Sequence, residues 1–168
     1  MRRVTVTDYN PEWETQFELA AAEIRKVLGE ECVAVYHIGS TSVQGLAAKP
    51  VIDLMPVVRD IQKIDRFNEE MAKIGFVAKG ENGLTGRRYF QKGGDERTHH
   101  VHVYQEGNKE IARHLVFCNY LRENPRVAEE YGTLKKKLAK EHPYDIQKYI
   151  EGKEPLVIQI EKRAMGEI

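Results

Sequence analysis

The stretch HIGSTSVQGLAAKPVID, residues 37–53, connects two predicted strands through a polar turn. The run CVAVYHI, residues 32–38, is rich in β-branched and aromatic residues, as is typical of a buried strand. The run VIDLMPVV, residues 51–58, has the same character, so the sequence predicts two neighbouring strands joined by a loop that begins at Gly39. Pro56 predicts that the second strand reaches a sheet edge or leaves the sheet there.

The loop between these strands combines a glycine with hydroxyl side chains. Gly39 allows close backbone approach, and the N–H groups and hydroxyls of Ser40 and Thr41 suit the oxygens of a phosphate. A short helix is expected over residues 42–48. The alternative is a polar strand-to-helix turn that the hydroxyls only cap. His37, just before the turn, is expected to be a satisfied core histidine rather than one that orients a ligand.

Asp53 is the one acidic residue in the run 51–58. An ionised carboxylate in an apolar strand is costly unless it is paired, so Asp53 is expected to contact Lys49, His102 or a metal ion. The structural alternative is a buried carboxylate that hydrogen-bonds the loop. Lys49 is either a solvated residue before Pro50 or the counter-charge of a phosphate. A phosphate turn with a carboxylate on the next strand favours a triphosphate, which needs a cradle and a ligand for its magnesium.

The remaining chain alternates helical and strand patterns without an internal repeat or a linker. Asparagine–proline pairs and Asp60 are typical helix starts, and Gly29 is a typical helix end. Helices are expected after Asn10, Asp60, Asn108 and Asn124 and from Tyr144, with Pro155 breaking or restarting the last one, and further strands at residues 76–80, 87–92 and 99–105. This order predicts one α+β or mixed α/β domain over residues 1–168 with a helical last third.

Charge and cysteine content narrow the class of protein. Lysine plus arginine and aspartate plus glutamate both number 26, and the resulting zero net charge argues against a nucleic-acid or membrane partner. No apolar run has the length of a membrane span, and residues 1–13 lack the apolar segment of a signal peptide. Cys32 and Cys118 lie far apart without metal-ligand spacing, which favours reduced thiols and a cytoplasmic location.

The segment YHIGSTSVQGLAAKPVIDL, residues 36–54, resembles the signature of the GrpB family within the nucleotidyltransferase superfamily of DNA polymerase beta. The resemblance continues through RTHHVHV, ARHLVFCNYLRENP, EEYGTLKKKLA and residues 144–148, and so covers nearly the whole chain. It implies an α+β fold: a mixed, largely antiparallel sheet packed with helices, and a helical C-terminal extension. It also implies a Gly-Ser turn that binds nucleotide phosphates and acidic residues on the next strand that bind a divalent metal. Some relatives are fused to dephospho-CoA kinase, which points to a nucleotide or a coenzyme as ligand.

The sequence departs from an active nucleotidyltransferase at the metal-binding strand. Such enzymes usually carry two carboxylates separated by one residue, but here Asp53 is followed by Leu54 and then Met55, whose thioether does not hold magnesium. A third strand offers His100 and His102, which share a face because residues two apart on a strand point the same way, whereas His99 is expected to be exposed on the other face. Imidazoles with a carboxylate suit zinc, manganese or iron better than magnesium. The expected cofactors are a divalent ion (Mg, Mn or Zn) and a nucleotide. The structural alternative is that the two histidines are surface residues, or that one of them hydrogen-bonds a carboxylate without a metal.

Other cationic residues have a functional and a structural interpretation. One of Arg87 and Arg88 is expected to point inward to a phosphate while the other is a solvated edge charge, and we assign Arg88 to the phosphate. Lys148 is a further candidate for the phosphate, since the family resemblance includes its segment. The run Lys135–Lys137 is expected to be the solvated face of a helix.

Two functions of different classes follow. The first is a metal-dependent transferase of nucleotidyl groups, in which Ser40 and backbone N–H groups bind the β- and γ-phosphates while Asp53 and His102 hold the metal. The second is a non-catalytic module that binds a nucleotide or a coenzyme and has lost the second carboxylate at Met55. Metal-dependent hydrolysis of a phosphoester is a third interpretation of the histidine–aspartate set. Each function implies a small phosphorylated ligand, and none sets an oligomeric state.

Overall fold

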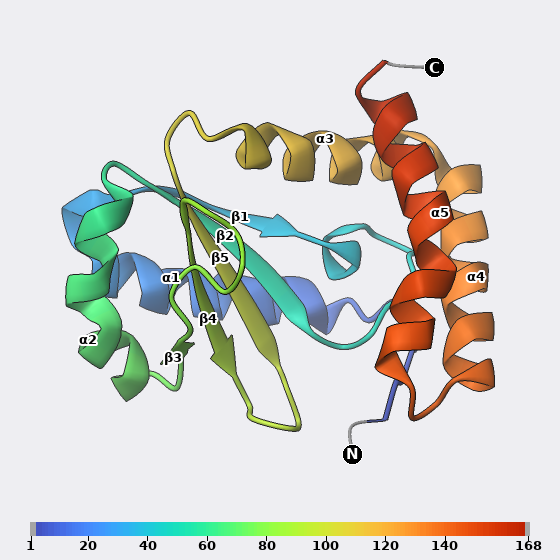
Figure 1. The fold of residues 1–168 in the computed structure, drawn as a ribbon, viewed down its shortest axis with the longest axis horizontal. Coiled ribbons are helices and arrows are strands. Elements are labelled where there is room, and N and C mark those ends of the chain that lie inside the picture. The colour runs from blue at the N-terminus through green and yellow to red at the C-terminus, as the bar shows by residue number, and fades with distance from the viewer. Residues whose placement is uncertain (1–2, 167–168) are drawn as a thin grey trace.

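A five-stranded sheet with the order β1-β2-β5-β4-β3 forms the centre of the molecule (Figure 1). The computed structural model describes residues 3–166, so the first two residues of the amino-terminal stretch lie outside the described residues. The strands are β1 (Cys32–Ile38), β2 (Ile52–Val58), β3 (Val77–Ala78), β4 (Arg87–Lys92) and β5 (His99–Gln105). β2 and β5 pair in parallel and the other neighbouring pairs are antiparallel, which confirms the expected mixed, largely antiparallel sheet.

The amino-terminal helices pack on one face of this sheet. α1 (Glu12–Leu28) begins where Oδ1 of Asn10 accepts a hydrogen bond from the N–H of Glu12 at 3.0 Å, and it ends at Gly29, whose φ is 56°. α2 (Asn68–Lys73) follows a 3₁₀ helix (Ile61–Phe67), in which Oδ1 of Asp60 accepts a hydrogen bond from the N–H of Gln62, the cap that was expected. Buried side chains of both helices join those of the strands in one core, which includes Trp13, Ile24, Leu54, Met71, Phe90 and Val101.

The three carboxy-terminal helices enclose the other side of the sheet. They are α3 (Lys109–Glu123), α4 (Pro125–Glu141) and α5 (Ile146–Ala164), and α4 and α5 lie side by side (Figure 1). Their buried side chains form a second core with the sheet, which includes Ile38, Met55, Tyr104, Leu121, Tyr131 and Ile160. Within residues 3–166, no helix is both long and apolar enough to span a bilayer. This arrangement confirms the helical C-terminal extension.

Three expectations about local structure are wrong. The short helix expected over 42–48 is instead a 3₁₀ turn at Ser40–Ser42. Pro56 lies inside the internal strand β2, and the pairs between β2 and β5 skip this residue, so its missing N–H leaves no bond of that ladder unmade. Pro155 does not interrupt α5, because Tyr149 and Ile160 on either side of it are buried and hold both halves of the helix in place.

Candidate functional site

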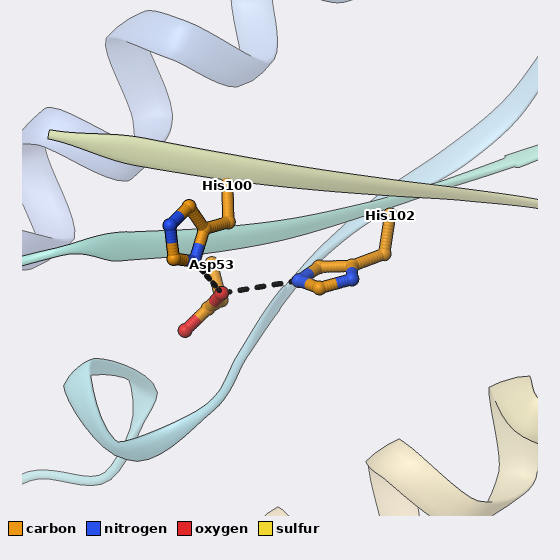
Figure 2. A group of neighbouring side chains, drawn as sticks. All are labelled: Asp53, His100 and His102. Atoms are coloured by element: carbon orange, nitrogen blue, oxygen red, sulfur yellow. Dashed lines mark hydrogen bonds and ion pairs between the residues drawn. The ribbon is translucent and has the colours of Figure 1, made fainter. Parts of the chain in front are cut away.

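Asp53 contacts two imidazoles across the β2–β5 pair (Figure 2). Oδ1 of Asp53 lies 3.1 Å from Nε2 of His102 and 3.4 Å from Nδ1 of His100. The parallel register sets Asp53 opposite His100, and strand alternation brings His102 to the same face. One candidate ligand atom from each of the three residues lies within 4.8 Å of the others. The structure therefore brings together the residues that the sequence predicted as metal ligands.

The histidines keep the carboxylate ionised. Burial acts to raise the pKa of Asp53, but the hydrogen bonds and charges of His100 and His102 outweigh burial and hold this pKa well below its usual range. Nη1 of Arg87 lies 3.5 Å from Nδ1 of His102. Because a guanidinium only donates, Nδ1 accepts, and the N–H of this imidazole is on Nε2, facing Asp53. A metal at Nε2 would therefore compete with a proton.

Two hydroxyl side chains of the turn after β1 make hydrogen bonds to residues of β1 or of the turn itself. Oγ of Ser42 donates to the carbonyl of Gly39 at 2.6 Å, and Oγ1 of the buried Thr41 hydrogen-bonds Nε2 of His37 at 3.0 Å. The ring of His37 also stacks on Phe17 at 4.6 Å between centroids, which confirms His37 as a satisfied histidine. Burial lowers the pKa of His37 to about 4.

A cavity of about 420 Å³ lies between this turn, the sheet and the helices α3, α4 and α5. Six residues predicted from the sequence line it: Gly39, Ser40, Thr41, Lys49, Asp53 and His100. His102 touches Asp53 but is not among the lining residues. The turn and the carboxylate thus open onto one space, and that space is large enough for a small ligand.

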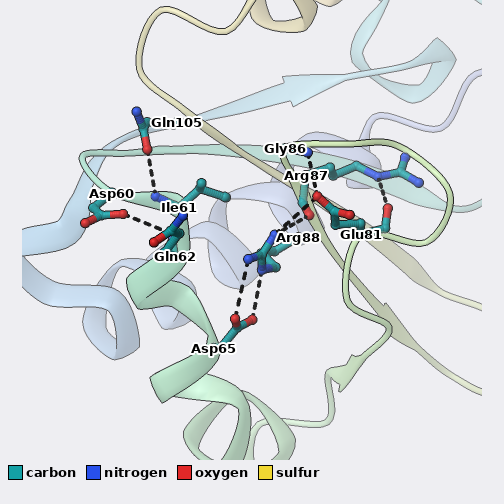
Figure 3. Close-up of polar contacts among 9 residues, drawn as sticks. All are labelled: Asp60, Ile61, Gln62, Asp65, Glu81, Gly86, Arg87, Arg88 and Gln105. Atoms are coloured by element: carbon teal, nitrogen blue, oxygen red, sulfur yellow. Dashed lines mark hydrogen bonds and ion pairs between the residues drawn. The ribbon is translucent and has the colours of Figure 1, made fainter.

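Arg88 and Lys148 are not brought to this cavity. Arg88 pairs with Val103 across the sheet, on the face that packs against α1 and α2. Its Nε donates to Oδ1 of Asp65 at 2.9 Å, and its Nη1 lies 3.9 Å from Oε2 of Glu81 (Figure 3). The arginine on the same face as His102 is Arg87, which also donates to backbone carbonyls of the loop before β4. Lys148 is exposed in the first turn of α5.

Lys135 is a cavity-lining residue that the sequence did not predict. It is 2% exposed and lines the cavity, so its expected place on a solvated helix face is wrong. Burial and the charges of Lys153 and Lys49 lower its pKa to about 6. The signal was the helical spacing, because Lys135 follows the buried Tyr131 by four residues and shares its face.

His99 lies on the opposite face from the site, as expected, but it is not exposed. Its ring is half-buried and lies edge-on to Phe76, 5.7 Å between centroids. Burial lowers the pKa of His99 to about 4. It therefore belongs to the core beside α2 and not to the candidate site.

The fold is that of the nucleotidyltransferases. Cid1 in complex with the UTP analog UMPNPP superposes with a TM-score of 0.55 at 19% identity, covering 79% of this chain and 42% of that chain. At this level of identity the likeness concerns the fold alone.

The chain with this fold belongs to the GrpB family, since the family model described as GrpB protein matches residues 3–163. The crystal structure of conserved protein GrpB from Enterococcus faecalis superposes with a TM-score of 0.94 at 52% identity, covering 97% of this chain and 98% of that chain. UPF0157 protein YqkA of Bacillus subtilis is 48% identical over 97% of this chain and 48% of its own length, so the chain spans about half of that relative.

Proposed function

We propose that this protein binds a nucleotide or a similar phosphorylated small molecule together with a divalent metal, and transfers the nucleotidyl group to an acceptor. The observation that carries the proposal is that the Gly39–Thr41 turn and the Asp53–His100 pair line the same cavity. The nucleotidyltransferase-like fold supports the same reaction class. We also propose that the protein is cytoplasmic and that its ligand is a small molecule rather than a nucleic acid.

The donor set fits a divalent metal of the first transition row. One carboxylate oxygen and two imidazole nitrogens converge from Asp53, His100 and His102, a combination that favours zinc or manganese over magnesium. Nδ1 of His100 faces Asp53, while Nε2 of the same ring is buried without a hydrogen-bond partner among the described residues. An ion held by Asp53 and the two imidazoles would supply positive charge for the phosphate oxygens.

The chain's own residues bind and orient the phosphates. Ser40 and Thr41 of the turn line the cavity, and Lys49, which also lines it, provides a counter-charge on the approach to β2. Asp53 stays ionised beside them because the two imidazoles lower its pKa. Catalysis at such a site depends on positioning and electrostatics, since phosphoryl chemistry needs little covalent help from the protein.

Calorimetric titration with MnCl₂ and ZnCl₂ tests the metal, and pyrophosphate release from ATP and UTP tests the transfer. We expect both to be lost in Asp53→Asn and metal binding to weaken at least about tenfold in His100→Ala. His99→Ala is the matched control, since this histidine neighbours His100 but lies on the other face. Metal affinity that survives Asp53→Asn unchanged contradicts the proposal.

A second candidate is a binding module without catalysis, and Met55 favours it. Met55 stands where an active nucleotidyltransferase usually carries its second carboxylate. Its side chain is 0% exposed and packs in the core under α3–α5, so this position supplies no acidic ligand. Asp53 is the one carboxylate in the metal-binding group found within residues 3–166. Binding of ATP without metal, and no pyrophosphate release with manganese or zinc, would select the module over the transferase.

A further inference from the structure

Lys135 is a nearly fully buried lysine whose amine has no polar partner. Its exposed fraction is 2%, and its Nζ lies 4.5 Å from the centroid of the Tyr131 ring. Among residues 3–166 that amine makes no hydrogen bond and no ion pair. The ammonium form of a buried amine is costly unless it is paired, and this amine faces a cavity. The missing partner is therefore expected to be an anion that enters the cavity.

Two more amines face the same end of the cavity. Nζ of Lys153 on α5 lies 5.3 Å from the centroid of the Tyr149 ring, and Nζ of Lys49 lies 5.4 Å from the same centroid. The side chain of Lys153 also makes no ion pair within the described residues. A loop, α4 and α5 thus each bring one lysine to this subsite, which we call the lysine group (Lys49, Lys135 and Lys153).

The nearby acidic groups that form ion pairs do not neutralise Lys135 or Lys153. Glu161 is paired with Arg113, with Oε1 2.8 Å from Nη1, and Glu154 is exposed at the rim. Asp53 attracts the amines from the sheet but is engaged by its two histidines. The titratable and charged groups that line the cavity with Lys135 are Lys49, Asp53, His100, Arg113, His114, Cys118, Tyr131, Tyr149, Lys153, Glu154 and Glu161.

We propose that the lysine group binds the di- or triphosphate end of the ligand, and that the cavity takes up a proton as this polyanion enters. The proposal deepens the proposed function by naming the charge that the ligand must carry, and it rests on that function for the identity of the remaining part of the ligand. A single phosphate reaches fewer of the three amines and is bound more weakly.

The proton uptake follows from the state of Lys135 before the anion arrives. Burial and the neighbouring lysines lower its pKa to about 6, so its amine is mostly neutral at pH 7.5. A phosphate oxygen beside the amine favours the ammonium form, which then binds a proton from solvent. Affinity for polyphosphate is therefore highest near pH 6 and falls as the pH rises.

Titration calorimetry with tripolyphosphate, pyrophosphate and orthophosphate, all without metal, tests this inference. Tripolyphosphate should bind at least about tenfold more tightly than orthophosphate. Repeating the titration at pH 7.5 in PIPES and in Tris, whose ionisation enthalpies differ, should reveal uptake approaching one proton. In Lys135→Met the proton uptake should vanish and tripolyphosphate should bind at least about tenfold more weakly, since a charge-assisted contact is lost.

Lys137→Met is the matched control, because Lys137 is on the same helix with a side chain 69% exposed, and it should bind as the unchanged protein does. Lys153→Met is a second variant at a half-buried position, and it should weaken tripolyphosphate binding while part of the proton uptake persists, since burial still lowers the pKa of Lys135. Equal affinity for the three anions, or tripolyphosphate binding that is unchanged in Lys135→Met, overturns the inference. If the unchanged protein binds tripolyphosphate as expected but does not bind manganese, that result counts against the metal part of the proposed function and not against this inference.

Discussion

Gly39 and Asp53 are in direct contact: a Cβ at Gly39 would lie 2.6 Å from Oδ2 of Asp53. The backbone at Gly39 has φ 71° and ψ −176°, a region that is essentially restricted to glycine. Oδ1 of the same carboxylate receives both imidazoles, so Oδ2 is the oxygen that lies against the turn. The turn and the acidic residue therefore form one unit, in which the absence of a side chain at position 39 sets the place of the carboxylate.

Gly39→Ala is expected to destabilise the protein and to displace Asp53. Strained backbone costs about 1–3 kcal/mol, and the clash with Oδ2 adds to it. Metal binding should fall with the displaced carboxylate. Gly45→Ala is the control, since Gly45 has φ 85° but nothing within 4 Å of its added Cβ. Urea unfolding and manganese titration check both variants, and equal losses in the two would show that the contact with Asp53 is unimportant.

The two neighbouring arginines should separate in their effects. Arg88→Met loses a partly exposed ion pair with Asp65, so the unfolding free energy should fall by no more than about 1 kcal/mol and the zinc affinity should stay unchanged.

Arg87→Met removes a positive charge and a hydrogen-bond donor from the side of His102 away from Asp53, which should tighten zinc binding several-fold. Urea unfolding measures the stability of Arg88→Met, and zinc titration followed by calorimetry measures the zinc affinity of both variants. Weaker zinc binding in Arg87→Met would mean that this arginine positions the imidazole for the metal.

Much of the fold could be predicted from local pattern alone. Three local patterns predicted elements that the structure contains: the β-branched run 32–38, the asparagine–proline helix start before Glu12, and the cap at Asp60. Each of these patterns depends on interactions between residues close together in the sequence. The expectations about two prolines were wrong because contacts between distant parts of the chain decide those positions. Pro56 and Pro155 are tolerated by long-range packing and pairing, which a single sequence does not reveal.

The site was predictable where one strand carries the information. Alternation along β5 places His100 and His102 on one face without knowledge of its neighbours. The choice between Arg87 and Arg88 needs the register between β4 and β5, and a shift of one residue reverses the face. Lys135 was missed because a lysine is normally exposed, although its spacing from Tyr131 marked the buried face.

Lys135→Met should stabilise the ligand-free protein, most strongly in mildly acidic solution. The pKa of Lys135 in the folded protein is lowered to about 6, below the value of an unfolded lysine, so the ammonium is the disfavoured form in the fold. Below about pH 6 both states carry the proton and the fold bears the whole cost of the buried charge. As the pH rises toward about 10 the folded amine is neutral, the cost disappears, and stability rises.

Urea unfolding near about pH 5, 7 and 9 measures this effect. Removing an unpaired buried charge should raise the unfolding free energy by roughly 1–3 kcal/mol at the lowest pH, and the gain should shrink as the pH increases. Lys137→Met, at an exposed position on the same helix, should change little at any pH. A variant that is stabilised in this way yet binds tripolyphosphate poorly would show that Lys135 is kept at a cost to stability for the sake of an anion. A Lys135→Met protein that is less stable than the parent near pH 5 would contradict this account, because its amine would then be a favourable part of the fold.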